Sequence, residues 1–272
     1  MAAVQRHPDK LRDRTVLLIA GTGGIGKGVA SALFARGARI ILTSTRQAKL
    51  DDTISQLLQL YPDVPQTNVS GYTLDLGSSS VEDNIKTMVS QLKKDGVDKI
   101  EHMAYFAGDP LAHMPIEDIT LDSWLKVSQV RTISCILAVK HILPLIQAAG
   151  PASAECSPSI TLTSGSVGDK PIPGGWLLTS MVASSLYGAG RQLALDLKPI
   201  RVNTVAPGAV DTDLWSGMSE EQRNGFFEDT KKRMPTGRVG DVRDVAESYL
   251  WCMGDGNVTG EVVRTNSGAL LV

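Results

Sequence analysis

The sequence predicts one α/β domain built on a doubly wound, parallel sheet of about seven strands. The main observation is an alternation along the chain between short apolar runs and longer segments with apolar positions at helical spacing. Strands separated by helices form parallel βαβ units with right-handed crossovers. A second observation is that no linker, repeat or low-complexity segment divides the 272 residues, of which 42% are hydrophobic. We therefore expect residues 1–272 to form a single domain that buries a substantial core.

The first unit begins with the apolar run from Thr15, breaks into glycines and continues as a helix over Lys27–Phe34. The other strands are predicted at short β-rich runs, namely Arg39–Thr43, Gly71–Leu74, Ile100–Ala107, Ser159–Thr163, Arg201–Val205 and Glu261–Thr265. The other helices are predicted from their apolar spacing, at Thr45–Leu60, Val81–Lys94, Leu121–Ala149, Ser180–Leu197, Ser219–Lys232 and Val242–Met253. We expect these helices to cover both faces of the sheet.

The charge balance and the apolar stretches of the sequence argue against a nucleic-acid-binding protein and against a membrane protein. The chain has 27 basic and 29 acidic residues, and its net charge of −2 argues against nucleic acid or an anionic membrane as the main partner. The longest apolar stretch, Ile133–Ile146, contains Lys140 and His141, so a buried helix is expected rather than a membrane span. The N-terminus lacks the apolar core of a signal peptide, which favours a cytoplasmic location.

The three cysteines, Cys135, Cys156 and Cys252, are not clustered. Two of them lie in apolar helical patterns. We therefore expect core thiols in a reducing compartment and no metal site.

The glycine-rich turn after the first strand predicts a nucleotide site. Gly21 and Gly24 let the chain turn and approach a ligand, and Gly26 lets the helix lie close to the strand. Thr22 and Ile25 belong to the same loop. The free N–H groups at the helix start would hold a pyrophosphate.

The end of the second strand indicates which dinucleotide is bound. It has no Asp or Glu to accept hydrogen bonds from a ribose 2′-hydroxyl. Ser44, Thr45 and Arg46 suit a 2′-phosphate instead, because Arg offers a planar cationic fork. NADP(H) is therefore favoured over NAD(H), and the alternative is that Arg46 only starts a solvated helix.

Short motifs also follow several of the later predicted strands. Asp75-Leu76 follow the third strand and Ala107-Gly108 follow the fourth. Ile200–Gly208 leads on to Thr212, and the chain closes with Thr259-Gly-Glu and Ser267-Gly268. With the glycine loop, these motifs resemble the short-chain dehydrogenase/reductase family over nearly the whole length.

This resemblance implies a Rossmann fold and further cofactor contacts. Asp75 and Leu76 would lie at the adenine edge, and Ala107 and Gly108 follow the fourth strand as they do in the family. The nicotinamide side would be formed by Pro207, Gly208, Val210 and Thr212. The family pairs its two long helices across two-fold axes, which implies a homodimer or homotetramer. Two departures are Ala20 in place of the first glycine and Tyr105-Phe106 in place of asparagines.

A larger departure lies at the active centre, where the family uses Ser, Tyr, Lys and Asn. Counting along the motifs places Ser166 at the Ser position, Thr179 at the Tyr position and Ala183 at the Lys position. Arg131 stands where the Asn is expected. Tyr187 has the right spacing to a cation but lies eight residues too far along its helix, so we interpret it as packing.

These losses predict unusual chemistry. A threonine hydroxyl is too weak an acid to replace the phenol, so ordinary ketone reduction should be poor. Hydride transfer to a cationic iminium acceptor needs no proton donor. Arg131 would hold a carbonyl or carboxylate of the substrate and Ser166 would donate a hydrogen bond to it. The alternative is that Arg131 pairs with a carboxylate, for which Asp109 and Asp169 are the candidates.

The substrate side is expected to be apolar and aromatic. Gly168–Trp176 is rich in Gly and Pro and is the best candidate for a mobile loop over the site. Trp176 and Trp215 are candidates to wall a pocket, or else pack under that loop. His113 is a weaker candidate for an acid.

Arg131, the missing Tyr and Lys, and Asp109-Pro110 together resemble a small fungal branch of the family. That branch acts in prenylated indole alkaloid pathways of the malbrancheamide and paraherquamide type. The likeness implies NADPH-dependent reduction of a cationic intermediate and an intramolecular [4+2] cyclisation, as in a Diels–Alderase. Ser166 and Asp169 depart from that branch, which has an acidic residue and an aromatic residue there. An ordinary carbonyl reductase with an unconventional acid and a non-catalytic NADP(H)-binding scaffold stay open as alternatives.

Overall fold

The sheet carries the fold, and its strands follow the predicted alternation. The structure is a computed structural model that describes residues 9–153 and 157–272. The strands are β1 (Thr15–Ile19), β2 (Arg39–Ser44), β3 (Val69–Thr73), β4 (His102–Tyr105), β5 (Ser159–Thr163), β6 (Arg201–Pro207) and β7 (Val262–Thr265). They pair in parallel in the order β3-β2-β1-β4-β5-β6-β7. The chain adds β2 and β3 on one side of β1 and β4 to β7 on the other, so the strand order reverses between β1 and β4. Ligands bind at such switch points, at the carboxyl ends of the strands.

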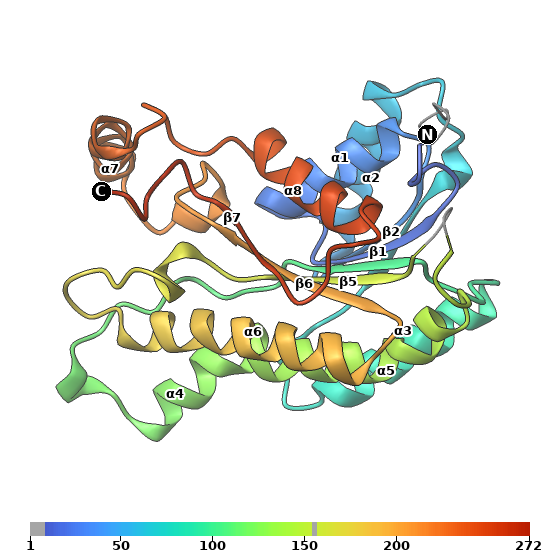
Figure 1. Cartoon of the computed structure of the whole chain (residues 1–272), viewed down its shortest axis with the longest axis horizontal. Coiled ribbons are helices and arrows are strands. Elements are labelled where there is room, and N and C mark those ends of the chain that lie inside the picture. The colour runs from blue at the N-terminus through green and yellow to red at the C-terminus, as the bar shows by residue number, and fades with distance from the viewer. Residues whose placement is uncertain (1–8, 154–156) are drawn as a thin grey trace, which may run out of the picture.

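Helices cover both faces of this sheet, as predicted. They are α1 (Gly24–Ala35), α2 (Gln47–Leu60), α3 (Val81–Lys94), α4 (Leu121–Ser128), α5 (Ser134–Gln147), α6 (Leu177–Asp196), α7 (Glu220–Arg233) and α8 (Val242–Gly254). α1, α2 and α8 lie on one face, and α3, α5 and α6 lie on the other (Figure 1). α7 lies near the C-terminus at one end of the molecule.

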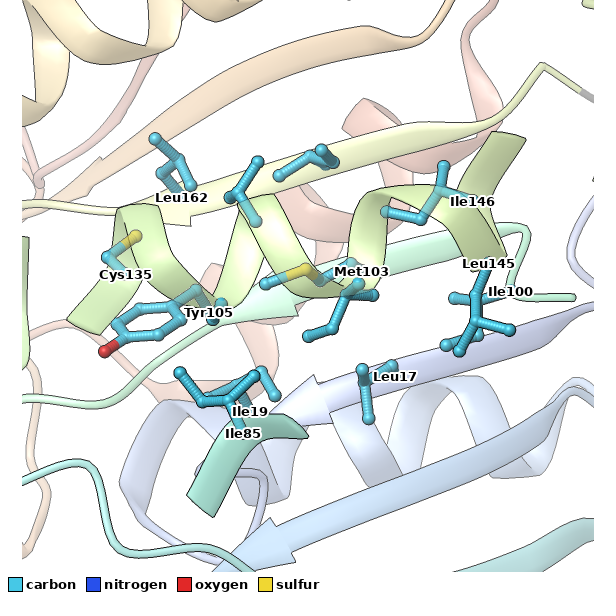
Figure 2. Packing of buried hydrophobic residues seen from close by; sticks show 14 of the residues in the cluster. Leu17, Ile19, Ile85, Ile100, Met103, Tyr105, Cys135, Leu145, Ile146 and Leu162 are labelled. Carbon is cyan, nitrogen blue, oxygen red and sulfur yellow. The ribbon is translucent and has the colours of Figure 1, made fainter. Parts of the chain in front are cut away.

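The apolar side chains of the strands pack into two cores, one on each face of the sheet. In β1, Leu17 and Ile19 point into the core shared with α3 and α5, whereas Val16 and Leu18 point into the core shared with α1 and α8. This strand is covered on both sides and presents apolar side chains to both cores, which explains the continuous run in the sequence. Figure 2 shows the first core, where Tyr105 of β4 lies beside Cys135 of α5.

The predicted single helix over Leu121–Ala149 is wrong in one respect. α4 ends at Ser128, a π turn occupies Gln129–Ile133, and α5 runs from Ser134 to Gln147. The Ser134 N–H donates to the Gln129 carbonyl, five residues back, instead of to the Val130 carbonyl alone as in a regular α-helix. The Tyr105 hydroxyl donates to that carbonyl at 2.5 Å. A tertiary contact that apolar spacing cannot reveal therefore accompanies the extra residue of the turn.

The same stretch is long and apolar enough to cross a membrane, with a mean hydropathy of 1.3 over its most apolar window. However, 44% of that window is buried inside the molecule, on the face that packs against the sheet. Length and hydropathy are therefore weak evidence for a membrane span here, because a core helix meets the same criteria.

Cys135 and Cys252 are buried free thiols, as expected, whereas Cys156 lies outside the described residues. Burial raises the pKa of both thiols to about 12, so they stay protonated. Within residues 9–153 and 157–272, His, Cys, Asp and Glu form no cluster suited to a metal ion.

Candidate active site

The turn between β1 and α1 forms a close-packed cradle. A Cβ on Gly26 would lie 2.8 Å from the Ala20 carbonyl oxygen, and one on Gly24 would lie 2.7 Å from the Thr212 Cβ. The helix start at Gly23 has no side-chain cap, so the first-turn N–H groups of α1 remain available to an anion. This part of the chain fits the pyrophosphate of a nicotinamide dinucleotide.

The departure at Ala20 leaves the turn in place. Ala20 adopts the left-handed backbone that the family's glycine would favour, with φ at 59°. This conformation costs an alanine about 1–2 kcal/mol. The Ala20 N–H donates to Thr43 Oγ1 at 2.9 Å, which ties the turn to β2. At Gly21 a Cβ would lie 2.8 Å from that of Leu18, so glycine is still required there.

The end of β2 offers the predicted phosphate ligands. Ser44 is buried as the last residue of the strand, and Thr45 and Arg46 are exposed in front of α2. Arg46 starts α2 without using its side chain as a cap. Its guanidinium therefore reaches solvent at the edge of the sheet where a 2′-phosphate is expected.

The other predicted cofactor residues follow strand ends at the same edge. Asp75 and Leu76 come after β3, where the exposed Asp75 accepts the Gly77 N–H at 2.9 Å and Leu76 is buried. Ala107 and Gly108 come directly after β4. Pro207 ends β6, and Gly208, Val210 and Thr212 follow it.

Arg131 lies in the π turn and reaches the end of β4. A Cβ on Gly108 would lie 2.6 Å from Arg131 Cζ, so the guanidinium rests directly on the glycine. Arg131 Nη2 donates to the Asp109 carbonyl oxygen. Desolvation by burial lowers the pKa of Arg131 below its usual range, yet a guanidinium stays charged. Arg131 therefore lies beside the residues that follow β4, and its role toward a substrate stays a prediction.

The alternative, in which Arg131 forms an ion pair with Asp109 or Asp169, is not found. Arg131 uses the backbone of Asp109, and no ion pair within 4.0 Å among the described residues includes Arg131. Asp169 instead binds Arg264 of β7 through two bonds of 2.8 and 3.0 Å. These bonds lower the pKa of Asp169, so it stays ionised. The interpretation of Asp169 as the partner of Arg131 is therefore wrong.

The positions of the family's Tyr and Lys hold no proton donor for a substrate. Thr179 is 6% exposed, and its hydroxyl donates to the Ala112 carbonyl at 2.8 Å. Ala183 is buried, and its carbonyl accepts the Ser164 hydroxyl at 2.8 Å. Ser166 begins the short 3₁₀ turn after β5 and is half-buried. Its hydroxyl has no hydrogen-bond partner in the described part of the chain, which leaves it available to a ligand.

Tyr187 packs within the fold, as predicted. It is 7% exposed, and its hydroxyl donates to the Gly165 carbonyl at 2.7 Å and to Asp169 at 3.1 Å. Burial raises the pKa of Tyr187 above its usual range. The phenol therefore stays protonated and holds the turn after β5.

The loop Gly168–Trp176 is anchored at both ends. Asp169 ties its start to β7, and near its end the Gly175 carbonyl accepts the Met114 N–H at 2.9 Å. Trp176 contacts His113 edge to face, with 5.3 Å between the ring centroids. The loops after β4 and β5 are thus joined to each other.

Trp215 belongs to a different aromatic group. Its Nε1 donates to the Val210 carbonyl at 2.8 Å, and its ring lies 4.6 Å from that of Phe226 in α7. Trp176 and Trp215 therefore sit on separate segments at the strand ends. The contacts given for each ring are packing contacts, so a role in walling a substrate pocket stays a prediction.

Sequence reasoning missed two residues that shape this site. Tyr105 was noted only as a departure, yet its hydroxyl secures the π turn that carries Arg131. Thr179 was noted only as a loss, yet it binds the loop after β4. The sequence did carry a signal for both residues. Tyr105 stands in place of a family asparagine and Thr179 in place of the family tyrosine, so each retains a polar group that can form a hydrogen bond.

Comparisons with known proteins agree with this geometry. Residues 7–272 match the family described as SDR-like Rossmann domain. The chain is 34% identical over 273 residues to the short-chain dehydrogenase/reductase malC of Malbranchea aurantiaca, with all of both chains covered. It is 33% identical to the short-chain dehydrogenase/reductase ucsE of an Acremonium species, with 98% of both chains covered.

Solved structures give the same result. The structure of MalC Reductase/Diels-Alderase from Malbranchea aurantiaca superposes with a TM-score of 0.86 and 32% identity, covering 97% of this chain and 99% of that one. A small-chain dehydrogenase in complex with NADPH shares the fold, with a TM-score of 0.74. The predicted fold and family are therefore confirmed, and the chain belongs to the short-chain dehydrogenase/reductase family of oxidoreductases.

Proposed function

We propose that this enzyme uses NADPH to reduce an iminium-type intermediate and couples that reduction to an intramolecular [4+2] cyclisation in fungal indole alkaloid biosynthesis. The substrate would be apolar and aromatic, and the protein cytoplasmic. Support comes from the full-length similarity to a fungal protein named a reductase/Diels-Alderase. Similarity to other fungal relatives, such as ucsE, supports specialised metabolism in the broader sense.

The observation that carries the proposal is that the family's proton-donating tyrosine and its lysine are missing, while the arginine Arg131 stands at the position of the family's asparagine. Thr179 and Ala183 stand where the family has its acid and its lysine, and the Thr179 hydroxyl is committed to Ala112. Arg131 is meanwhile held by a backbone carbonyl and not by a carboxylate. A reduced nicotinamide supplies a hydride when it is bound. An iminium carbon accepts that hydride and becomes a neutral amine, so no proton is needed from the protein.

The chain's own residues would bind and orient the substrate. Arg131 would donate its remaining N–H groups to a carbonyl of the substrate, and Ser166 would donate its hydroxyl. For the cyclisation, the requirement is to hold diene and dienophile in contact, and such positioning lowers the barrier without an acid or a base. Asp109 would contribute through its carbonyl, which fixes the guanidinium.

Preference for NADPH over NADH rests on Arg46. Its exposed side chain follows the end of β2 without a role as a helix cap. Replacement of Arg46 by alanine should weaken NADPH binding by about tenfold or more and leave NADH binding nearly unchanged, because only the 2′-phosphate contacts this cation. Fluorescence titration with both dinucleotides measures this.

We also propose that the enzyme is a dimer or tetramer. Large apolar side chains stay exposed along α4, the π turn and α5, and also along α6; they are Leu121, Leu125, Ile133, Ile136, Leu177, Met181 and Leu195. An apolar surface of this kind favours self-association. Light scattering coupled to gel filtration measures the mass directly, and a monomer at micromolar concentration contradicts the proposal.

The test of function is a single-turnover challenge. NADPH bound to the protein is mixed with a cyclic iminium, and loss of nicotinamide fluorescence is followed together with formation of the amine. We expect oxidation of NADPH by the wild-type enzyme. Replacement of Arg131 by alanine should slow it by about a hundredfold while NADPH affinity stays the same.

Other outcomes would contradict the proposal. Efficient oxidation of simple alcohols would identify an ordinary carbonyl reductase. Tight NADPH binding without any iminium reduction would indicate a redox-neutral cyclase or a scaffold. Each of these results overturns the assignment as an iminium reductase but leaves the family assignment untouched.

A further inference from the structure

The loop after β4 depends on other elements for its position. From Ala107 to Met114 the backbone makes three hydrogen bonds to other described residues. Arg131 donates to the Asp109 carbonyl, Thr179 donates to the Ala112 carbonyl, and the Met114 N–H donates to the Gly175 carbonyl. The π turn, α6 and the loop after β5 therefore each supply one anchor.

Thr179 supplies the middle anchor, and it does so from the first turn of α6. The bond to Ala112 is 2.8 Å long, and the side chain is 6% exposed. Ala112 is half-buried, and Thr179 is the donor that the described residues provide to its carbonyl. The Thr179 hydroxyl therefore ties Ala112 to the start of α6.

We propose that Thr179 is a positioning residue, which holds the loop after β4 against α6 and so fixes the direction of the Arg131 guanidinium. The connection runs through the short segment from Ala112 to Asp109, whose carbonyl accepts from Arg131. Pro110 stiffens this segment, because its ring restricts the backbone. A shift of the loop at Ala112 is therefore transmitted to the carbonyl that orients the cation.

The same anchor joins two loops on the substrate side. Beyond Ala112, His113 contacts Trp176 and Met114 binds Gly175. Because Thr179 lies close to Trp176 in sequence, the start of α6 and the loop before it hold the β4 loop as one unit. This inference rests on the proposed function only for its effect on turnover, since the attachment itself is a property of the fold.

The experiment compares three variants with the wild-type enzyme. Thr179→Val has nearly the same shape and lacks the hydroxyl, whereas Thr179→Ser retains it. The matched control is Thr204→Val, which removes another buried hydroxyl that donates to a carbonyl of α6, at Leu186, away from the loop. Hydrogen exchange of the peptide spanning residues 108–119 reports the attachment, because it contains the Met114 amide.

We expect exchange of this peptide to become about tenfold faster in Thr179→Val and to stay near the wild-type rate in Thr179→Ser and Thr204→Val. With a cyclic iminium, kcat of Thr179→Val should fall about tenfold while the dissociation constant of NADPH stays within about twofold of wild type. Recovery of kcat in Thr179→Ser identifies the hydroxyl as the cause.

Two results would overturn the inference. Unchanged exchange in Thr179→Val would show that the hydroxyl does not hold the loop. Faster exchange with an unchanged kcat would show that the loop is held but does not position Arg131. If the wild-type enzyme reduces no iminium, the proposed function fails instead, and the exchange measurement still decides whether Thr179 anchors the loop.

Discussion

At the scale of single residues, two glycines of the site differ in what surrounds them. A Cβ on Gly108 would meet Arg131 Nη1 and Cζ at 2.6 Å, and these atoms are the far end of a flexible side chain. A Cβ on Gly26 would meet the Ala20 carbonyl oxygen at 2.8 Å and the Gly21 Cα at 2.9 Å, which are backbone atoms. The first clash can be relieved by moving the guanidinium, whereas the second cannot be relieved without reshaping the turn.

Replacement of Gly108 by alanine should therefore separate activity from stability. We expect the free energy of unfolding to fall by less than about 1 kcal/mol, because the arginine swings aside. Turnover should fall by about tenfold to a hundredfold, because a displacement of about 1 Å at a positioned group has that effect. Urea unfolding and single-turnover kinetics measure the two quantities.

The contrasting variant is Gly26→Ala. It should lose NADPH binding and unfold at lower temperature, since the α1 turn must open. Wild-type turnover in Gly108→Ala would mean that the position of the guanidinium over residue 108 is not needed for the reaction.

At the scale of elements, the π turn is the feature on which the site depends most. It presents Arg131, and the Tyr105 hydroxyl from β4 secures it through the Val130 carbonyl at 2.5 Å. Burial raises the pKa of Tyr105 well above its usual range, so the phenol stays protonated and can donate. The position of the cation is thus tied to the adjacent core strand.

Replacement of Tyr105 by phenylalanine should weaken both stability and turnover. The Val130 carbonyl would lose the hydrogen bond from the buried phenol, which costs about 1–3 kcal/mol. A matched control is Tyr249→Phe, which removes the 2.7 Å hydrogen bond between a fully buried phenol and Thr163. We expect comparable losses in urea unfolding, but a fall in turnover only for the Tyr105 variant. Equal turnover in the two variants would contradict the coupling.

Local sequence patterns predict most of the elements but not this turn. The short apolar run Val16–Ile19 is visible because this strand presents apolar side chains to the cores on both faces. The apolar spacing of Leu121–Gln147 continues through the π turn, so nothing in it marks the extra residue. Likewise the sequence places Arg131 at the site but cannot reveal that Asp169 is already bound to Arg264, because that contact joins segments 95 residues apart.

At the scale of the whole molecule, a buried histidine at the opposite end of the sheet predicts a loss of stability in acid. His102 begins β4, is 1% exposed, and its Nδ1 lies 2.9 Å from the Ser159 hydroxyl. Desolvation by burial, with further contributions from Arg201 and Arg14, lowers its pKa to about 3. Between this value and the unfolded value of about 6.5, only the unfolded chain takes up the proton.

Stability should therefore fall as the pH is lowered from neutral. The folded pKa is depressed, so the contribution of neutral His102 is complete above pH 6.5 and declines below it. We expect about 2 kcal/mol of unfolding free energy to be lost between pH 7.5 and 5, measured by urea unfolding. His102→Gln should be less stable at neutral pH but show a flatter profile over this range. An unchanged slope in that variant would assign the acid sensitivity to other groups.

The carbonyl that holds Arg131 leaves the positive charge of the side chain uncompensated within 4.0 Å by any described carboxylate. A guanidinium in that condition attracts small oxyanions from the surrounding solution. Inorganic phosphate or sulfate should then compete with the organic substrate, so that apparent KM values rise in phosphate buffer relative to an amine buffer of equal ionic strength. The choice of buffer thus becomes part of any assay of this enzyme, and insensitivity of Arg131→Ala to phosphate would identify where the anion binds.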